Sequence, residues 1–258
     1  MKKNFIVALS FVSFLILSAC GNQTRAKLRG TLEGISETCP LVVDQTLSLT
    51  GMKMNEDTVQ IDYQSVDDVK PYELFQENAD MRRNLLHLLV KGQTKLNDQL
   101  MTDVIKEKMW IKMCFAEREN KGKTTLLFSP EEIEKAISTP MSKRDFAEAV
   151  IDLKADLVKK TLPKEYAKDI ILVDVKKNDA DLTYLHSADK KNVEMVSTET
   201  GKYTFKRELS DKLVYDKDLL NALVDSKREL KYVLKEEKSG KAEECVFTVN
   251  ELKNMSRR

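Results

Sequence analysis

The chain has 258 residues, of which 43 are Lys or Arg, 42 are Asp or Glu and two are His, giving a formal net charge of +1 at pH 7. Setting aside Lys2 and Lys3 at the N-terminus leaves 41 basic residues against 42 acidic ones. Because the basic and acidic residues are nearly equal in number, the chain has no global electrostatic field that would attract nucleic acid or an anionic lipid surface. Nucleic acid is therefore not expected as a partner. After the leader segment about 240 residues remain, enough for one large or two small hydrophobic cores.

The first nineteen residues have the parts of a secretory signal peptide. Lys2 and Lys3 precede an uncharged apolar stretch from Phe5 to Ala19. A basic start, a short apolar run and small residues at its end are typical of a cleaved leader. A stretch of this length falls short of the ~30 Å hydrocarbon core of a bilayer, which disfavours a permanent transmembrane helix.

The leader ends in Leu17-Ser18-Ala19-Cys20, which resembles the lipobox of bacterial lipoproteins. The resemblance implies that Cys20 receives a diacylglycerol thioether and becomes the first mature residue after cleavage at Ala19. Several acyl chains on one residue anchor a protein stably, because each buried methylene contributes about 0.8 kcal/mol. An ordinary signal peptide followed by a chance cysteine is the alternative. Because no Asp and no acidic run follows Cys20, the resemblance implies the periplasmic face of the outer membrane in a cell that has one.

Two parts of the mature chain are similar to each other. Residues 96–137 align without gaps onto 215–256, a shift of 119, with a shared apolar pattern. Upstream, residues 50–63 align onto 171–184 at a shift of 121. Such internal similarity predicts two copies of one domain. The expected organisation is a lipoprotein signal peptide at 1–19, a tether at 20–33, repeat 1 at 34–138 and repeat 2 at 142–258.

Each copy is predicted to contain two strand hairpins separated by a helical region. The evidence is alternation in the strands, near-helical apolar spacing between them, and turn or capping residues at the boundaries. Copy one is expected to have strands at 47–54 and 58–63, a helical region at 78–106 that breaks at Gly92, strands at 109–118 and 124–129, and a short helix to Ile137 capped by Ser129.

Copy two is predicted to follow the same plan after a stronger leading helix. Ser142 is expected to cap this helix, with Asp145 three residues on, as in a capping box. The fold class is therefore α+β, two tandem copies of a hairpin, helix and hairpin domain, with both sheets antiparallel and the helices on one face. Copy two is expected to have strands near 168–176 and 180–186, a helix near 205–226, strands at 229–238 and 243–248, and a last helix from Asn250.

Three cysteines, Cys39, Cys114 and Cys245, follow the lipidated one. Outside the cytoplasm a disulfide can persist. Cys39 and Cys114 both lie in copy one, and copy two has Lys160 and Val233 at the positions that align with them. This joint absence makes Cys39 and Cys114 a candidate disulfide, although two unpaired buried thiols would give the same pattern. Cys245 is expected to be a small core residue.

No grouping of residues in the sequence indicates a catalytic or metal site. The Cys and His spacings that bind zinc are missing, His87 is expected on a solvated helix face, and His186 has no nucleophile or acid at a catalytic spacing. Residues 178–181 (NDAD) begin like a calcium loop but lack its ligand ladder and glycine. Copy one has residues 55–57 (NED) at the same turn, which favours turn chemistry. No catalytic residue, metal or cofactor is predicted.

A second resemblance covers the start of copy one. Residues 39–44, Cys-Pro-Leu-Val-Val-Asp, are similar to the Cys-Pro-x-x-Val-Asp opening of small secreted bacterial domains of unassigned function. Copy two has Thr161-Leu162-Pro163 and no Cys-Pro, so the similarity weakens there. The family supplies no catalytic residues, and Cys39 and Asp44 are expected to fix the entry to the first strand.

Together these features predict a lipid-anchored cell-envelope protein that is a non-enzymatic binding or structural module, attached to the membrane through Cys20 and facing a protein partner. Tandem binding modules gain affinity through raised effective concentration. One alternative is an envelope hydrolase that uses paired carboxylates, although no pattern selects a pair. Another is a protein that inhibits an enzyme of a host or competitor, an idea that depends on analogy alone.

Overall fold

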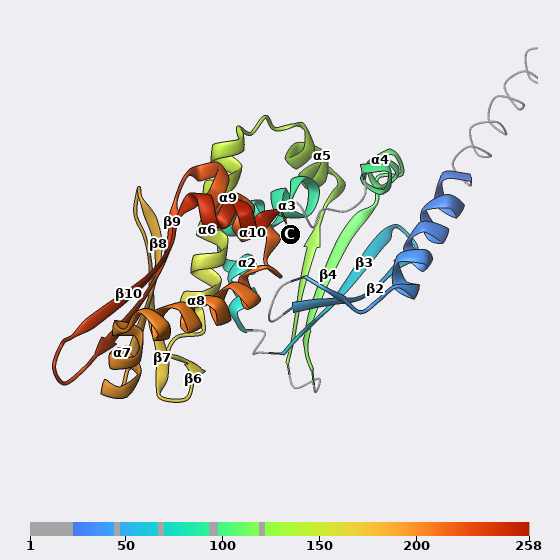
Figure 1. Ribbon diagram of the computed structural model, residues 1–258. Coiled ribbons are helices and arrows are strands. Elements are labelled where there is room, and N and C mark those ends of the chain that lie inside the picture. Colours follow the sequence, from blue (N-terminus) through green and yellow to red (C-terminus); the bar gives the residue numbers. More distant parts are fainter. Residues whose placement is uncertain (1–22, 44–46, 67–69, 93–97, 119–121, 258) are drawn as a thin grey trace, which may run out of the picture.

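The structure, a computed structural model, describes residues 23–43, 47–66, 70–92, 98–118 and 122–257. These residues form two α+β units with the same order of elements, which confirms the predicted fold class and duplication. Each unit has a leading helix, a strand hairpin, a helical segment, a second hairpin and a closing helix. The helices of the two units meet in the middle of the molecule, with one sheet on either side (Figure 1).

Unit 1 begins with a helix over residues 23–37, where the sequence predicted a tether up to residue 33. Leu28 and Leu32 on this helix are fully buried in the core of unit 1. The segment is therefore the counterpart of the leading helix of unit 2. The other elements of unit 1 are β1 (Leu41–Val42), β2 (Leu47–Asn55), β3 (Thr58–Ser65), the short helices η1 (Lys70–Glu73) and α2 (Leu74–Glu77), α3 (Ala79–Lys91), α4 (Asp98–Lys106), β4 (Trp110–Glu117), β5 (Lys123–Phe128) and α5 (Pro130–Ser138).

Between its two hairpins, unit 2 contains three helices where the sequence predicted one near 205–226. Thr198 and Asp216 each accept a backbone N–H at the start of a new helix, and such caps divide a helical stretch. The elements of unit 2 are α6 (Lys143–Lys160), β6 (Lys164–Ala167), β7 (Ile170–Lys177), β8 (Asp181–Ala188), α7 (Lys190–Ser197), α8 (Glu199–Leu213), α9 (Lys217–Ser226), β9 (Glu229–Glu236), β10 (Ala242–Phe247) and α10 (Val249–Ser256).

Both sheets are mixed, and the prediction of fully antiparallel sheets was wrong. The strand orders are β1-β2-β3-β4-β5 and β10-β9-β8-β7-β6. The hairpins are antiparallel, but β3 runs parallel to β4 and β8 runs parallel to β9. The helical segment between the hairpins causes this, because it returns the chain to the end of the sheet where the preceding strand began. Crossovers of this kind are what parallel neighbours require.

A β-bulge at the same place in each first hairpin fixes how the units correspond. The register shifts between Leu49 and Gly51 in β2 and between Leu172 and Asp174 in β7. The first hairpins therefore correspond at a shift of 123, and the predicted shift of 121 was wrong by two residues. A slip of two residues keeps every side chain on the same face of a strand, so apolar alternation could not detect it. The second hairpins keep the predicted shift of 119.

One face of each sheet is covered by helices and the other is open, as predicted. In β4, Ile111 and Met113 are buried in the core of unit 1, whereas Trp110 and Lys112 alternate with them and point outward. Helix α6 packs against both cores, with Leu153 in the core of unit 1 and Ile151 in the core of unit 2. It thereby joins the two units.

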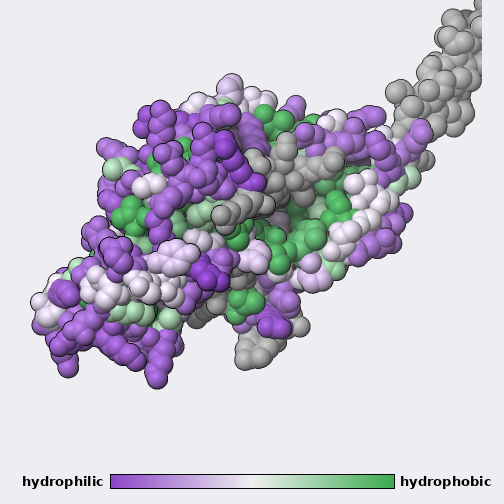
Figure 2. All heavy atoms as spheres, viewed as in Figure 1, coloured by the Kyte–Doolittle hydropathy of each residue, from purple (hydrophilic) through white to green (hydrophobic). Residues whose placement is uncertain are grey.

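The surface seen in Figure 2 is mostly hydrophilic, with apolar residues gathered near its middle. Among the described residues, no helix has the length and apolar character needed to cross a bilayer.

Candidate functional site

The outer face of sheet 1 has a depression at the end where β2 turns into β3. Its volume is about 590 Å³ and it is open to solvent. Alternation along β3 and β4 directs Thr58, Gln60 and Lys112 to this face, while the residues between them enter the core. The lining residues are Met54, Asn55, Glu56, Thr58, Gln60 and Lys112.

Two side-chain amides are oriented in the depression. The Nδ2 group of Asn55 donates to Oε1 of Gln60 over 3.4 Å, and Nε2 of Gln60 donates to Oδ1 of Asp62 over 2.7 Å. The ammonium group of Lys112 has no ion-pair or hydrogen-bond partner within the described ranges. The depression therefore combines amide groups, a hydroxyl group, the carboxylate of Glu56 and an ammonium group that has no partner among the described residues.

An exposed tryptophan borders the depression. Trp110 is the Cα partner of Thr58 in the parallel β3–β4 pair, so the two side chains leave the sheet on the same side. It is the only tryptophan of the chain and is 39% exposed. Leu127, opposite Lys112 on β5, is 45% exposed. Trp110 and Leu127 thus place two large, partly exposed apolar side chains on the same face as the depression.

The same positions in unit 2 are closed by a carboxylate. The bulge alignment pairs Asn55, Thr58 and Gln60 with Asn178, Asp181 and Thr183, and Lys112 with Lys231. Oδ1 of Asp181 accepts hydrogen bonds from Nδ2 of Asn178 at 2.9 Å and from the hydroxyl group of Thr183 at 2.7 Å. Its Oδ2 lies 2.8 Å from Nζ of Lys231. Although burial acts to raise it, the pKa of Asp181 is held below its ordinary value by these three donors.

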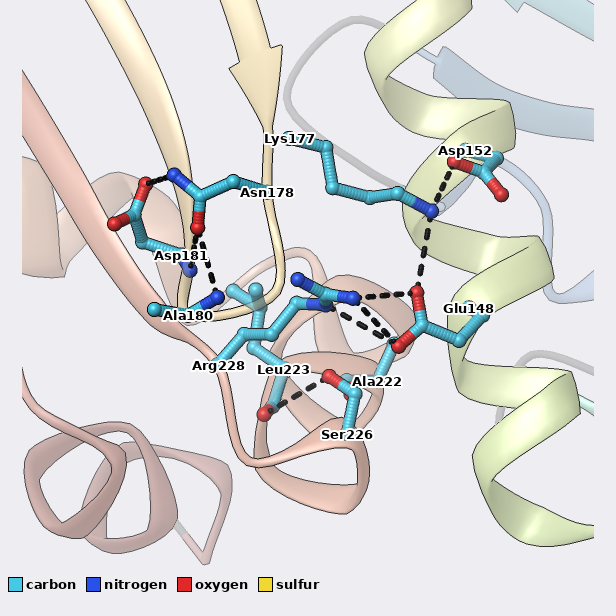
Figure 3. Close-up of polar contacts among 10 residues, drawn as sticks. All are labelled: Glu148, Asp152, Lys177, Asn178, Ala180, Asp181, Ala222, Leu223, Ser226 and Arg228. Carbon is cyan, nitrogen blue, oxygen red and sulfur yellow. Dashed lines mark hydrogen bonds and ion pairs between the residues drawn. The ribbon is translucent and has the colours of Figure 1, made fainter.

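The turn that begins at Asn178 is built by that side chain, as the sequence predicted. Its Oδ1 accepts the backbone N–H groups of Ala180 and Asp181 at 2.7 and 2.9 Å (Figure 3). This geometry is an Asx turn, which orders the residues that follow it. The turn therefore holds Asp181 at the start of β8, where its carboxylate reaches Lys231.

A second polar cluster in Figure 3 fastens α6 to the sheet of unit 2. Arg228, only 4% exposed, donates from Nη2 to both carboxylate oxygens of Glu148 at 2.9 and 3.0 Å. Lys177 at the end of β7 joins Glu148 at 3.1 Å and also pairs with Asp152. Burial alone would raise the pKa of Glu148, but Arg228 and Lys177 lower it. These contacts join helix α6 to the end of β7 and to the residue before β9, which is a structural role.

Five of the described carboxyl groups have a lowered pKa, which is the opposite of what a general acid needs. Each resolved shift of a carboxyl pKa is downward, for Glu131, Glu132, Glu148, Asp181 and Glu251. A glycosidase-type acid needs the opposite shift, a pKa raised toward neutrality. Within the described part of the chain, no group of three His, Cys, Asp or Glu side chains is placed to hold a metal ion.

The structure does not join the two cysteines that the sequence paired. Cys39, Cys114 and Cys245 are all free thiols. Cys39 is half-buried just after the leading helix, where Sγ donates to the carbonyl of Ile35, and Cys114 is buried in the middle of β4. The arrangement is that of unpaired thiols, the alternative to a disulfide. Cys245 is a core residue, as predicted. Cys20 and Asp44 lie outside the described residues.

Both histidines are core residues. His87 is 2% exposed, so its predicted place on a solvated helix face was wrong. It faces the packed side of α3, and burial, followed by Lys91 and Arg83, lowers its pKa. His186 is fully buried and its pKa is lowered by burial to about 4.

The depression on sheet 1 was missed in the sequence. Lys112 and Trp110 alternate with buried apolar residues in the strand, which indicates an outward direction. The informative comparison, Thr58 against Asp181, was hidden because the upstream alignment was off by two residues.

Comparison with known proteins gives no family assignment. No protein-family model matches the chain, and no curated protein matches it. A solved structure from Pseudomonas aeruginosa, PA3611, described provisionally as a secreted protein, is similar to part of the chain at a TM-score of 0.36 and 14% identity. The similarity covers 44% of this chain and 99% of that one. It is too slight to identify a fold family.

Proposed function

We propose that the protein is a lipid-anchored binding protein of the bacterial cell envelope, acylated on Cys20 and extracytoplasmic, on the periplasmic face of the outer membrane where the cell has one. Its binding surface is the outer face of sheet 1. The observation that carries the binding role is the ammonium group of Lys112, which has no partner among the residues that the structure describes, whereas unit 2 satisfies the equivalent lysine internally. An unsatisfied charge beside oriented amides is available to a ligand.

The duplication suggests a division of roles. Unit 2 closes its own site with Asp181, and its leading helix α6 also packs on the core of unit 1. Unit 1 keeps its site open and begins with a helix at residue 23, three residues after Cys20. Three residues of extended chain span about 11 Å at most. A lipid on Cys20 would therefore hold unit 1 next to the bilayer, with unit 2 as its support.

The anchor is tested with the full chain in a bacterial host fed a clickable palmitate. Wild-type protein should be labelled and should enter the detergent phase on partitioning, whereas Cys20→Ala should do neither. Cys39→Ala is the matched control and should be labelled like wild type. Equal labelling of wild type and Cys20→Ala would contradict a lipid anchor on Cys20.

The binding surface is tested by placing a photo-crosslinking amino acid at Leu127, beside Lys112, and at the corresponding Val246 of unit 2. Cells carrying the Leu127 variant should give a specific adduct that the Val246 variant does not give. Adding Thr58→Asp, which supplies the carboxylate that unit 2 has at this place, should abolish the adduct. No adduct at position 127, or an equal one at 246, would contradict a binding role for sheet 1.

A further inference from the structure

In unit 2, Asp181 occupies the position that corresponds to the open site of unit 1. In unit 2 its carboxylate receives an amide N–H from Asn178, a hydroxyl hydrogen from Thr183 and the charge of Lys231. Unit 1 keeps an amide and an ammonium group at the same positions, Asn55 and Lys112, and adds the amide of Gln60. The residue that changes is the carboxylate itself, which is Thr58 in unit 1. In unit 1 the amide of Gln60 is already held by Asp62, and one N–H of Asn55 donates to Gln60. Within the described residues, the ammonium group of Lys112 and the second N–H of Asn55 have no acceptor and could hold a carboxylate that residue 58 does not supply.

The charge around Lys112 suits one carboxylate and disfavours a polyphosphate or a nucleic acid. Glu56 lines the depression, and Asp57 and Asp62 lie near it, the first paired with Arg25 at 2.8 Å and the second with Lys53 at 3.9 Å. A polyphosphate or nucleic acid would need several unpaired cations. With one unpaired lysine among acidic neighbours in the described part of the chain, the site can hold one carboxylate at a time, so any further carboxylates of the ligand must lie away from these neighbours.

The rest of the surface suits a sugar ring. The indole of Trp110 offers a flat apolar face, while Asn55, Thr58 and Gln60 offer both donors and acceptors. A pyranose has complementary features, an apolar C–H face and a rim of hydroxyl groups. β3 and β4 are paired on both sides, so they present no free backbone edge to which an extended peptide could add. The depression is also open, which suits part of a long chain better than an enclosed small molecule.

We propose that this site binds a saccharide that carries a carboxylate group, with the carboxylate on Lys112 and Asn55 and the ring against Trp110. The proposal rests on the binding function assigned above to sheet 1. It assigns unit 1 the recognition of an acidic glycan and explains why only unit 2 retains the internal carboxylate.

The only tryptophan of the chain makes the test direct. Full-length protein in detergent is titrated with tetragalacturonate while the emission of Trp110 is followed. The emission should change and saturate, and uncharged maltotetraose should bind at least about tenfold more weakly. Lys112→Gln should weaken binding of tetragalacturonate about tenfold, the loss typical of a charged hydrogen bond. Thr58→Asp should abolish it, and Lys176→Gln on the outer face of sheet 2 should leave it unchanged.

Other outcomes overturn the proposal in different ways. Equal binding of maltotetraose and tetragalacturonate would show that the site does not recognise the carboxylate. If hexaglutamate or inorganic phosphate saturates the change in Trp110 emission and tetragalacturonate has no effect, the site does not recognise a sugar ring. If tetragalacturonate fails while the crosslink at Leu127 persists, the binding role of sheet 1 stands and the ligand class is wrong. If both fail, the binding role fails as well. Thermal unfolding of Thr58→Asp and Lys112→Gln shows that each variant is folded before it is scored.

Discussion

The carboxylate of Asp181 lies 2.8 Å from the ammonium group of Lys231, and the residues at the same two positions in unit 1 are Thr58 and Lys112. A duplicated domain has thus kept the lysine in both copies and the carboxylate in one. In unit 2 the pair completes the turn between β7 and β8, because Asn178 bonds to the same carboxylate. In unit 1 the corresponding Lys112 lies on the outer face of the sheet without such a carboxylate at residue 58.

Removing the carboxylate of unit 2 should cost stability. Asp181→Thr leaves Lys231 and the amide of Asn178 without their partner, and we expect the free energy of unfolding in urea to fall by about 1–3 kcal/mol. Asp179→Thr changes the same residue type in the same turn at an exposed position and should alter it by less than about 0.5 kcal/mol. Equal effects of the two substitutions would show that Asp181 has no special structural role.

The contribution of Asp181 should depend on pH in one direction. Its pKa is lowered in the folded protein, chiefly by Lys231 acting against burial. The unfolded state therefore binds a proton first as pH falls. The stability that Asp181 provides is complete above the ordinary aspartate value of 3.8 and is lost as pH drops through the lower, folded value. The difference in unfolding free energy between wild type and Asp181→Thr should narrow in acid, as urea titrations at pH 7 and pH 3 can show.

The cysteines should behave as three free thiols. Burial raises the pKa of the Cys39 and Cys245 thiols, which slows their reaction because the thiolate is the reactive form. Protein purified without reductant should give three thiols with Ellman's reagent after unfolding, and half-buried Cys39 should react first in the folded state. Cys39→Ser should change the free energy of unfolding by less than about 1 kcal/mol. A loss of about 2–5 kcal/mol, accompanied by a single reactive thiol, would indicate the disulfide instead.

Much of the local structure could be predicted because its causes are local. Ser129 and Ser142 cap their helices as predicted, each accepting a backbone N–H three residues on, and Gly92 ends α3. The hairpin strands fall within a few residues of their predicted bounds for the same reason, since turn residues and alternation are properties of neighbouring positions.

The errors concern relations between distant residues. Whether β3 and β4 run parallel depends on where the intervening helices pack, which no short pattern records. The helix over residues 23–37 was not predicted as part of unit 1, because its place there depends on the packing of Leu28 and Leu32 in the core. The site was missed for a related reason: Lys112 is significant because of what Thr58 lacks, and those residues come together only across a parallel strand pair.

The joint between α6 and sheet 2 should be sensitive to the charge of Glu148. Glu148→Gln removes the carboxylate that holds the nearly buried Arg228, and we expect the free energy of unfolding to fall by about 2 kcal/mol. Asp152→Asn, one turn along the same helix and half exposed, removes a contact to Lys177 only and should cost less than about 1 kcal/mol. Urea unfolding of the two variants in parallel measures both. A larger loss for Asp152→Asn would reverse the assignment of the anchoring residue.

Finally, His186 should make the protein less stable in mild acid. The ring is fully buried, 5.2 Å from the ring of Tyr166 and 5.9 Å from that of Tyr232, and Lys212 lies over Tyr166. Burial lowers the pKa of His186 to about 4 from an ordinary value of 6.5. Between these values the unfolded chain holds a proton that the folded chain does not, so the free energy of unfolding should fall by about 3 kcal/mol as pH drops from 6.5 to 4.

His186→Phe keeps an aromatic ring beside Tyr166 and Tyr232 but cannot take up the proton. Its unfolding free energy should therefore change about 3 kcal/mol less than that of wild type between pH 7 and pH 4. His87, which is also buried with a lowered pKa, stays in both proteins, so its titration cancels in the comparison. Urea denaturation followed by circular dichroism at several pH values gives the two curves. Parallel curves for wild type and His186→Phe would show that this histidine does not cause the loss in acid, whereas curves that converge toward pH 7 and separate below 6.5 follow from its burial.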